Sequence, residues 1–321
     1  MNTTTNFNAA QNIINNLSKK SKRSFAYYSK EVKNQAYYFS PAYRDFVSNI
    51  IKNSSLKIKN IYNSGSIYSL DYENDNEEKL KKRKQNQIYT DINNKDTLPH
   101  ELGHAVDFWF GREKALSTVV LIEDKTLYDV FTEEFESKYQ ELYKLVMNEY
   151  KEIINSNIND KAYDILINNM PKYRELRSVE INSKDKETTL RRKKLQKELY
   201  ESGFVETYYL LLKKKCFSIL NTKYSLILDA LSSKYDFEHL CLAHHENTYY
   251  KCSKFRPVYE FFANVFAAKV TSKHQHFNNL IKLLPKSFNA FEKLFVIFYD
   301  RIQNNKRFLD VKLKKGNSNE L

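Results

Sequence analysis

The chain has 321 residues, of which 41% are hydrophobic and 14% aromatic, and this composition excludes a disordered protein. It contains only five glycines and five prolines, so few tight turns can form, and a predominantly helical α+β fold is expected. The formal net charge of +13 suits an anionic partner such as nucleic acid. The lysines are scattered among acidic residues rather than gathered in one stripe, so nucleic-acid binding is an alternative that is not favoured.

The cysteines and the apolar runs indicate the expected compartment. Cys216, Cys241 and Cys252 form no C-x-x-C pair, so neither a disulfide framework nor a thiolate zinc site is indicated. The first 25 residues contain no apolar segment typical of a secretory signal, and apolar runs such as 294–298 are far too short to cross a bilayer. We expect no membrane span and a cytoplasmic location, with association with a virion or delivery into another cell as alternatives. The sequence leaves the oligomeric state open.

In chain order, the sequence predicts one domain between two polar ends. Residues 1–24 are rich in Asn, Ser, Thr and Lys and are expected to form a weakly ordered arm, and residues 311–321 a polar tail. A single domain is expected over residues 25–310. A helical insertion interrupts it at about 124–215, where apolar residues recur at helical spacing.

Short alternating segments predict a small mixed sheet in the first third of the chain. Residues 56–72 alternate between apolar and polar side chains in two runs, with Asn63-Ser64-Gly65 as a turn between them. A third run, 87–92, comes shortly before the helix described next. It is either an edge strand, able to bind an extended peptide by backbone pairing, or an ordinary strand of the sheet.

The strongest motif is H-E-x-x-H in the segment 97–111. Thr97 is a suitable N-cap, Pro99 falls in the first turn, and Gly111 suits the position after the last turn, so a helix is predicted here. The alternative is a surface helix that happens to carry two histidines. Apolar side chains on the opposite face argue for a buried helix instead, and they are Leu102, Ala105, Val106, Trp109 and Phe110.

The residue types of this motif are those of a metal site. His100 and His104 are four apart and project from the same side of the helix, one turn above the other. Two neutral imidazoles in that arrangement can share one tetrahedral Zn²⁺, and Glu101 then lies beside the ion as an acceptor for a proton of water. Asp107, three residues past His104, is expected to orient one imidazole by a hydrogen bond without itself contacting the metal.

A zinc ion that keeps a position open for water needs a third protein ligand. The pattern H-E-x-x-H-x-x-G-x-x-H/D is excluded, because its glycine and last-ligand positions hold Asp107 and Phe110. A glutamate from a later helix is the other common solution. Glu260 is the best candidate, because it borders the apolar stripe of a helix predicted to start at Pro257, where a carboxylate is costly unless a cation or donor neutralises it.

Two alternatives to this ligand assignment stay open. Glu260 also fits a partly exposed glutamate in the first turn of a helix, favoured by the helix dipole. Glu246, beside His244 and His245, is a rival ligand. Asn264, one turn after Glu260, is expected to hold a metal ligand in place without itself contacting the metal.

The segments 100–107 and 260–266 together resemble the catalytic domain of anthrax lethal factor and the related zinc peptidase domains of bacteria and their phages. Looser similarity extends over about residues 40 to 305. The resemblance implies a zincin-like (gluzincin) fold over the single domain and zinc bound by His100, His104 and Glu260. It also implies Glu101 as general base and a protein or peptide as substrate.

The sequence departs from lethal factor at one position of the resemblance. Lethal factor carries a transition-state tyrosine seven residues before the ligand glutamate, and that position here is Ser253. The surrounding segment is more similar to the phage-type members, which favours Tyr250 as the donor to the oxyanion, with Tyr249 and His245 as alternatives. All three also fit an ordinary loop of packed aromatic rings and a surface histidine.

The motif and the resemblance together predict a zinc-dependent endopeptidase that uses Glu101 as general base. Two rival classes are a phage or mobile-element structural protein with an architectural zinc site, and a basic nucleic-acid-binding protein. An acid at Glu101 and only three protein ligands speak against the first rival, because structural zinc usually has four. Steeply salt-dependent binding would support the second.

Overall fold

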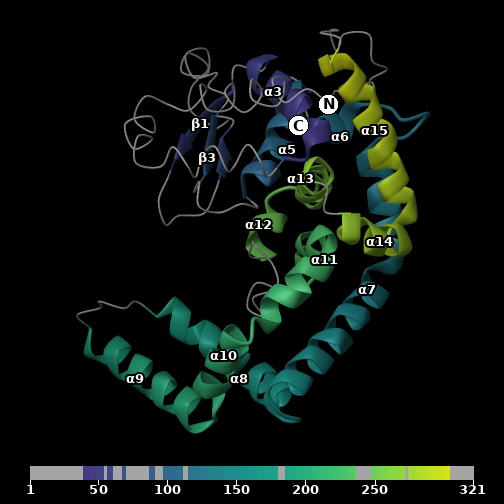
Figure 1. Cartoon of the computed structure of the whole chain (residues 1–321). Coiled ribbons are helices and arrows are strands. Elements are labelled where there is room, and N and C mark those ends of the chain that lie inside the picture. Colours follow the sequence, from purple (N-terminus) through teal and green to yellow (C-terminus); the bar gives the residue numbers. More distant parts are fainter. Residues whose placement is uncertain are drawn as a thin grey trace. The chain divides into compact units, whose positions relative to one another are not determined.

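The computed structural model describes residues 39–53, 56–60, 67–69, 87–90, 97–110, 115–179, 185–235, 247–271 and 274–303, and Figure 1 shows their helices and strands. The chain divides into two compact units. Unit 1 takes the described residues up to Ser137 and from Phe255 onward, and unit 2 runs from Lys138 to Lys254. The expected predominantly helical character is confirmed.

Unit 1 contains the sheet and the helices that border the candidate site. Its elements are η1 (Pro41–Tyr43), α3 (Arg44–Asn53), β1 (Lys57–Asn60), β2 (Ile67–Ser69), β3 (Gln87–Thr90), α5 (Thr97–Phe110), α6 (Leu116–Val119), the first turns of α7 (Leu127–Asn157), α13 (Arg256–Val270), α14 (His274–Leu283) and α15 (Pro285–Gln303). Unit 2 contains the rest of α7, α8 (Ala162–Ser178), α9 (Lys186–Glu201), α10 (Phe204–Lys213), α11 (Cys216–Ser232) and α12 (Asn247–Lys251).

The three short strands pair in the order β1-β3-β2. Strand β3 is parallel to β1 and antiparallel to β2, and the buried Ile58 and Ile88 are register partners. Strands β2 and β3 also contact α5. Because β3 has a neighbour on each side, the interpretation of the run 87–92 as an edge strand is wrong. The edges of the described sheet are β1 and β2.

Helix α5 is buried along its apolar face. Leu102 and Val106 have no exposed surface, and Ala105 is 1% exposed. Full burial of a side chain of leucine or valine size contributes about 1.5–3 kcal/mol to folding, so this face fixes the rotation of the helix about its axis. The helix ends at Phe110, directly before Gly111.

Helices α5 and α13 approach each other closely at Gly103. A Cβ atom placed on Gly103 would lie 2.6 Å from Cα and 3.0 Å from the carbonyl oxygen of Ala263. Glycine within a helix is about 1 kcal/mol less favourable than alanine, and here the close approach of the two backbones requires it. The same contact brings the start of α13 beside the H-E-x-x-H turn of α5.

Aromatic rings from α3, α13 and α15 pack together in the core of unit 1. The ring centroid of Phe262 lies 5.4 Å from that of Phe291, and the centroid of Phe266 lies 6.2 Å from that of Phe298. From α3, Phe46 adds a contact of 5.7 Å to Phe298. Large rings of this kind dominate core energetics, so α13 is held between α5 and this aromatic cluster.

Unit 2, Lys138–Lys254, begins and ends later in the chain than the helical insertion expected at about 124–215. Helix α7 is continuous over 31 residues and crosses from one unit to the other, so unit 2 begins within it. At its other end unit 2 also includes α11 and α12. The expected arm at 1–24 and tail at 311–321 lie outside the described residues. No helix in the described part is both long enough and apolar enough to cross a membrane.

Replacing Gly103 with alanine is expected to lower the free energy of unfolding by about 1–3 kcal/mol, because the new Cβ overlaps backbone atoms of Ala263 that cannot rotate aside. Denaturant titration followed by circular dichroism measures the change. Gly203→Ala is the control for metal affinity: nothing lies within 4 Å of its Cβ position, its φ of +75° costs about 1–2 kcal/mol of backbone strain, and it belongs to unit 2 whereas the candidate ligands belong to unit 1. Metal affinity should fall in Gly103→Ala alone. Unchanged stability and metal affinity in that variant would contradict the close approach.

Candidate metal centre

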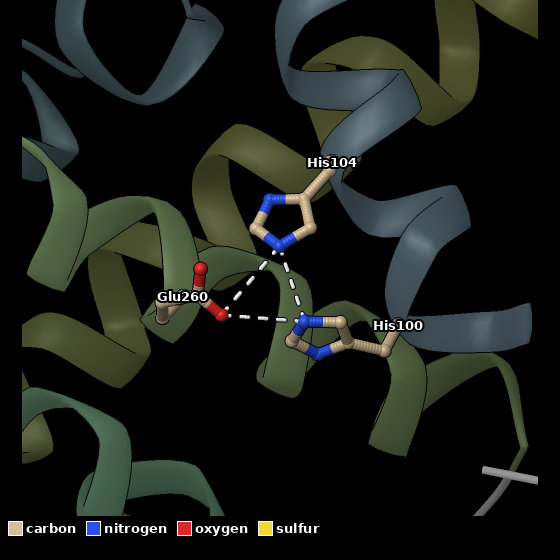
Figure 2. A group of neighbouring side chains, drawn as sticks. All are labelled: His100, His104 and Glu260. Atoms are coloured by element: carbon tan, nitrogen blue, oxygen red, sulfur yellow. Dashed lines mark hydrogen bonds and ion pairs between the residues drawn. The ribbon is translucent and has the colours of Figure 1, made fainter. Parts of the chain in front are cut away.

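Three side chains converge where α5 meets α13, as Figure 2 shows. Nε2 of His104 lies 3.1 Å from Nε2 of His100. Oε2 of Glu260 lies 3.3 Å from Nε2 of His100 and 3.5 Å from Nε2 of His104. The three residues together form a group that can hold a metal ion.

These separations fit a tetrahedral ion. Ligand atoms about 2.0–2.1 Å from a zinc ion and at tetrahedral angles to one another lie about 3.4 Å apart, close to the three observed distances. The Glu260 side chain is only 1% exposed, and a buried carboxylate is costly unless a positive charge compensates it. A cation bound by one carboxylate and two imidazoles supplies that charge.

The amide of Asn264 sets the tautomer of one candidate ligand. Its Oδ1 lies 2.9 Å from Nδ1 of His100. An amide oxygen can only accept a hydrogen bond, so Nδ1 carries the proton, and the neutral ring keeps its lone pair on Nε2, the atom that faces Glu260. Helix α13 therefore supplies one candidate ligand and, one turn later, the group that orients another.

Glu101 lies between the two histidines in sequence and is 6% exposed. Within the part of the chain that the structure describes, no group donates a hydrogen bond to this carboxylate and no cation pairs with it. A buried acid that has no structural partner is available to accept a proton.

Asp107 is fully buried and accepts two hydrogen bonds from Ser117. The Ser117 N–H donates to Oδ1 at 2.7 Å, and its hydroxyl donates to Oδ2 at 2.8 Å. Burial raises the pKa of Asp107 to about 7, while the Ser117 hydrogen bonds and the charge of His104 act in the opposite direction. The carboxylate thus ties α5 to α6, and its expected role in orienting an imidazole stays a prediction.

The candidates for an oxyanion donor lie in unit 2 or outside the described residues. Tyr250 in α12 is 5% exposed, and its hydroxyl donates to Oδ1 of Asp229 at 3.4 Å. The ring of Tyr249 lies 5.1 Å from that of Tyr250. His245 and the rival ligand Glu246 fall outside the described residues. The catalytic role of Tyr250 stays a prediction.

Sequence reasoning missed three residues that shape the site. Gly103 allows the close helix contact, and a glycine inside a strong helical pattern was the available signal. Ser117 holds Asp107, and nothing in the local pattern marks it. Tyr259 precedes the candidate ligand, and its ring lies 4.7 Å from that of Phe108 on α5. Burial and then the charge of Asp107 raise the pKa of Tyr259.

Comparisons of the chain with family models, with curated proteins and with solved structures give no match. The interpretation of the centre therefore depends on its own residues and distances.

Replacing Asn264 with leucine should weaken metal binding about 10–100-fold, because His100 loses the acceptor that fixes its tautomer and ring orientation. Competition for Zn²⁺ against a chromophoric chelator measures the affinity. Asn264→Asp keeps an oxygen acceptor at the same place and should bind at least as tightly as the natural protein. If the leucine variant binds as tightly as Asn264→Asp, the hydrogen bond has no role in the site.

Proposed function

We propose that this chain is a zinc-dependent endopeptidase with a zincin-like fold, of the gluzincin type found in the catalytic domain of anthrax lethal factor. The observation that carries the proposal is the convergence of His100, His104 and Glu260 next to Glu101, an acid with no hydrogen-bond or ion-pair partner among the described residues. The H-E-x-x-H helix packed against β2 and β3 of a small mixed sheet supports it further.

The residues divide the chemical work between them. His100 and His104 would hold the ion through Nε2, and Glu260 through Oε2. A Zn²⁺ held by these residues would supply a Lewis acid for the scissile carbonyl and would lower the pKa of water toward neutrality. The Glu101 carboxylate accepts a proton from the attacking water and passes it to the leaving amine nitrogen. Asn264 keeps the imidazole of His100 in the tautomer that this arrangement needs.

An architectural zinc site fits these residues less well. Structural zinc usually has four protein ligands, whereas this group has three and leaves one tetrahedral position for water or substrate. A structural role also gives no reason to bury Glu101 beside the two histidines. We infer a protein or peptide substrate, and the resemblance favours a phage or mobile-element role.

Replacing Glu101 with glutamine is expected to reduce peptide hydrolysis by about 10²–10⁴-fold while metal content stays unchanged, because the amide has similar shape but cannot accept the proton. Digestion of a peptide library, read by mass spectrometry, measures the loss, and metal analysis of the same preparation checks occupancy. Glu141→Gln, an exposed glutamate of α7, is the matched control and should cleave normally. A zinc-replete and fully active Glu101→Gln protein would refute the base assignment.

Removal of the metal should abolish cleavage and lower the melting temperature. An ion that binds only the folded state stabilises it by about 2.7 kcal/mol when its free concentration is 100 times its dissociation constant. Thermal melts of chelator-treated protein, with and without added Zn²⁺, measure this shift. His100→Ala should show no shift on zinc addition. An unchanged melt of the natural protein together with chelator-resistant cleavage would refute a metal-dependent mechanism.

A further inference from the structure

Unit 2 contains an apolar groove lined by residues of α8, α9 and α10. These three helices, labelled in Figure 1, pack against one another. Its cavity volume is about 440 Å³. Aromatic rings line its base: the centroid of Phe204 lies 5.6 Å from that of Tyr208 and 5.2 Å from that of Tyr173. Phe204 is 2% exposed, so the base of the groove is part of the core of this unit.

The walls of the groove expose large apolar side chains to solvent. Tyr200 is 76% exposed, Tyr209 67%, Leu212 50% and Val205 48%. These four are half of the exposed large hydrophobic side chains in the described part of the chain. Single exposed apolar residues are ordinary, but a cluster around a concave surface is typical of a protein-binding site.

Basic residues border the same groove. Lys193 lies one helical turn before the lining residue Gln196, and Lys213 lies one turn after Tyr209 and begins a run of three lysines. Both lysines are exposed, and neither forms an ion pair with any group that the structure describes. This border favours a negatively charged occupant.

Of the neighbouring acidic side chains, Glu198 and Glu201 are matched by lysines, whereas the exposed Glu206, next to Val205, offsets one positive charge of the border. Glu198 forms an ion pair with Lys172 at 2.9 Å, and Glu201 lies 3.6 Å from Lys197. Lysines of α8 and α9 therefore match Glu198 and Glu201, and Lys193 together with the exposed run Lys213–Lys215 outweighs the single charge of Glu206.

We propose that this groove binds an acidic amphipathic helix of a partner protein. The apolar face of that helix lies on Tyr200, Tyr209 and Leu212, and its acidic side chains face Lys193 and Lys213. Helices bind grooves in this way through apolar residues spaced at i, i+3, i+4 and i+7. The groove is concave, whereas the surface of a bilayer is flat, and its wall includes the aliphatic Val205 and Leu212, which offer no ring for a base to stack on, beside the two tyrosines. The site lies within unit 2, so the proposal is independent of the zinc chemistry.

Fluorescence anisotropy with the full-length protein tests the proposal. The probe is a labelled helical peptide with Leu and Phe on one face and Glu on the other. Its counterparts are a scrambled peptide of the same composition and a version with Lys in place of Glu. The acidic amphipathic peptide is expected to bind at least about tenfold more tightly than either counterpart, because only it matches both the groove and its border.

Variants on exposed positions show where the peptide binds. Tyr209→Ser and Leu212→Ser should each weaken binding about tenfold, as expected for anchors of an interface. Lys213→Glu should weaken binding and reduce its dependence on salt. Val296→Ser is the matched control, because Val296 is 64% exposed on α15 and lies outside the groove. Circular dichroism melts establish that the variants remain folded.

Each other outcome overturns the proposal. If the scrambled or the lysine peptide binds as tightly as the acidic peptide, or if no peptide binds, the acidic helix is not the occupant. If Tyr209→Ser leaves the binding of the acidic peptide unchanged, the peptide does not bind in this groove. Tighter binding to phosphatidylserine vesicles or to oligo(dT), lost in Tyr209→Ser and Lys213→Glu, would assign the groove to a membrane or to single-stranded nucleic acid instead.

Discussion

The contact between Gly103 and the backbone of Ala263 sets the geometry on which the candidate centre depends. The two histidines are held one turn apart by the hydrogen bonds of a single helix, and their spacing needs no other support. The carboxylate comes from a different helix, so its distance to the imidazoles is set by how closely the helices pack. Interaxial distances of 8–10 Å are usual, and the side chains at the contact decide the value. A glycine opposite an alanine allows a close approach, and Glu260 then lies within 3.5 Å of both rings.

The two helices present matching pairs of residues to each other. His100 and His104 are four apart on α5, and Glu260 and Asn264 are four apart on α13. The group that supports His100 is a neutral amide rather than a carboxylate. A carboxylate in that place would raise the basicity of the imidazole and add negative charge. With one anionic ligand and a neutral support, an ion with two positive charges would keep a net positive charge, and in the proposed hydrolysis it would polarise a substrate carbonyl more strongly.

Local patterns were enough to predict both helices and the three candidate ligands. Apolar periodicity and the four-residue spacing act within a single helix, and α5 and α13 follow them, although α5 already includes Thr97, the predicted N-cap, and Phe255 precedes α13 without a side-chain cap. Glu260 was found across a large separation in sequence because a carboxylate beside an apolar stripe needs compensation, and this argument requires no knowledge of the fold. Asn264 was found by the same spacing rule that relates the two histidines.

Features that arise from packing between distant segments could not be predicted. Nothing near Asp107 indicates that its partners are the N–H and hydroxyl of Ser117, because that pairing depends on how the chain turns after α5. The central position of β3 depends on which strands pair, and alternation within one strand does not contain that information. The start of unit 2 falls inside α7, where helical periodicity continues unchanged while the packing partners change.

Helix α7, which belongs to both units, affects where proteolysis can separate them. Near its start, Phe131 lies 4.7 Å from Phe261 of unit 1, whereas Glu149, further along, binds Lys223 and Tyr224 of unit 2. Proteases need a segment that can become extended, and a continuous helix gives them none at this crossing. The return crossing, at Ser253 and Lys254, is not helical. Of the two crossings between the units, only the return crossing is therefore suited to proteolysis, and the continuous helix α7 would keep the two units covalently joined after a cut there.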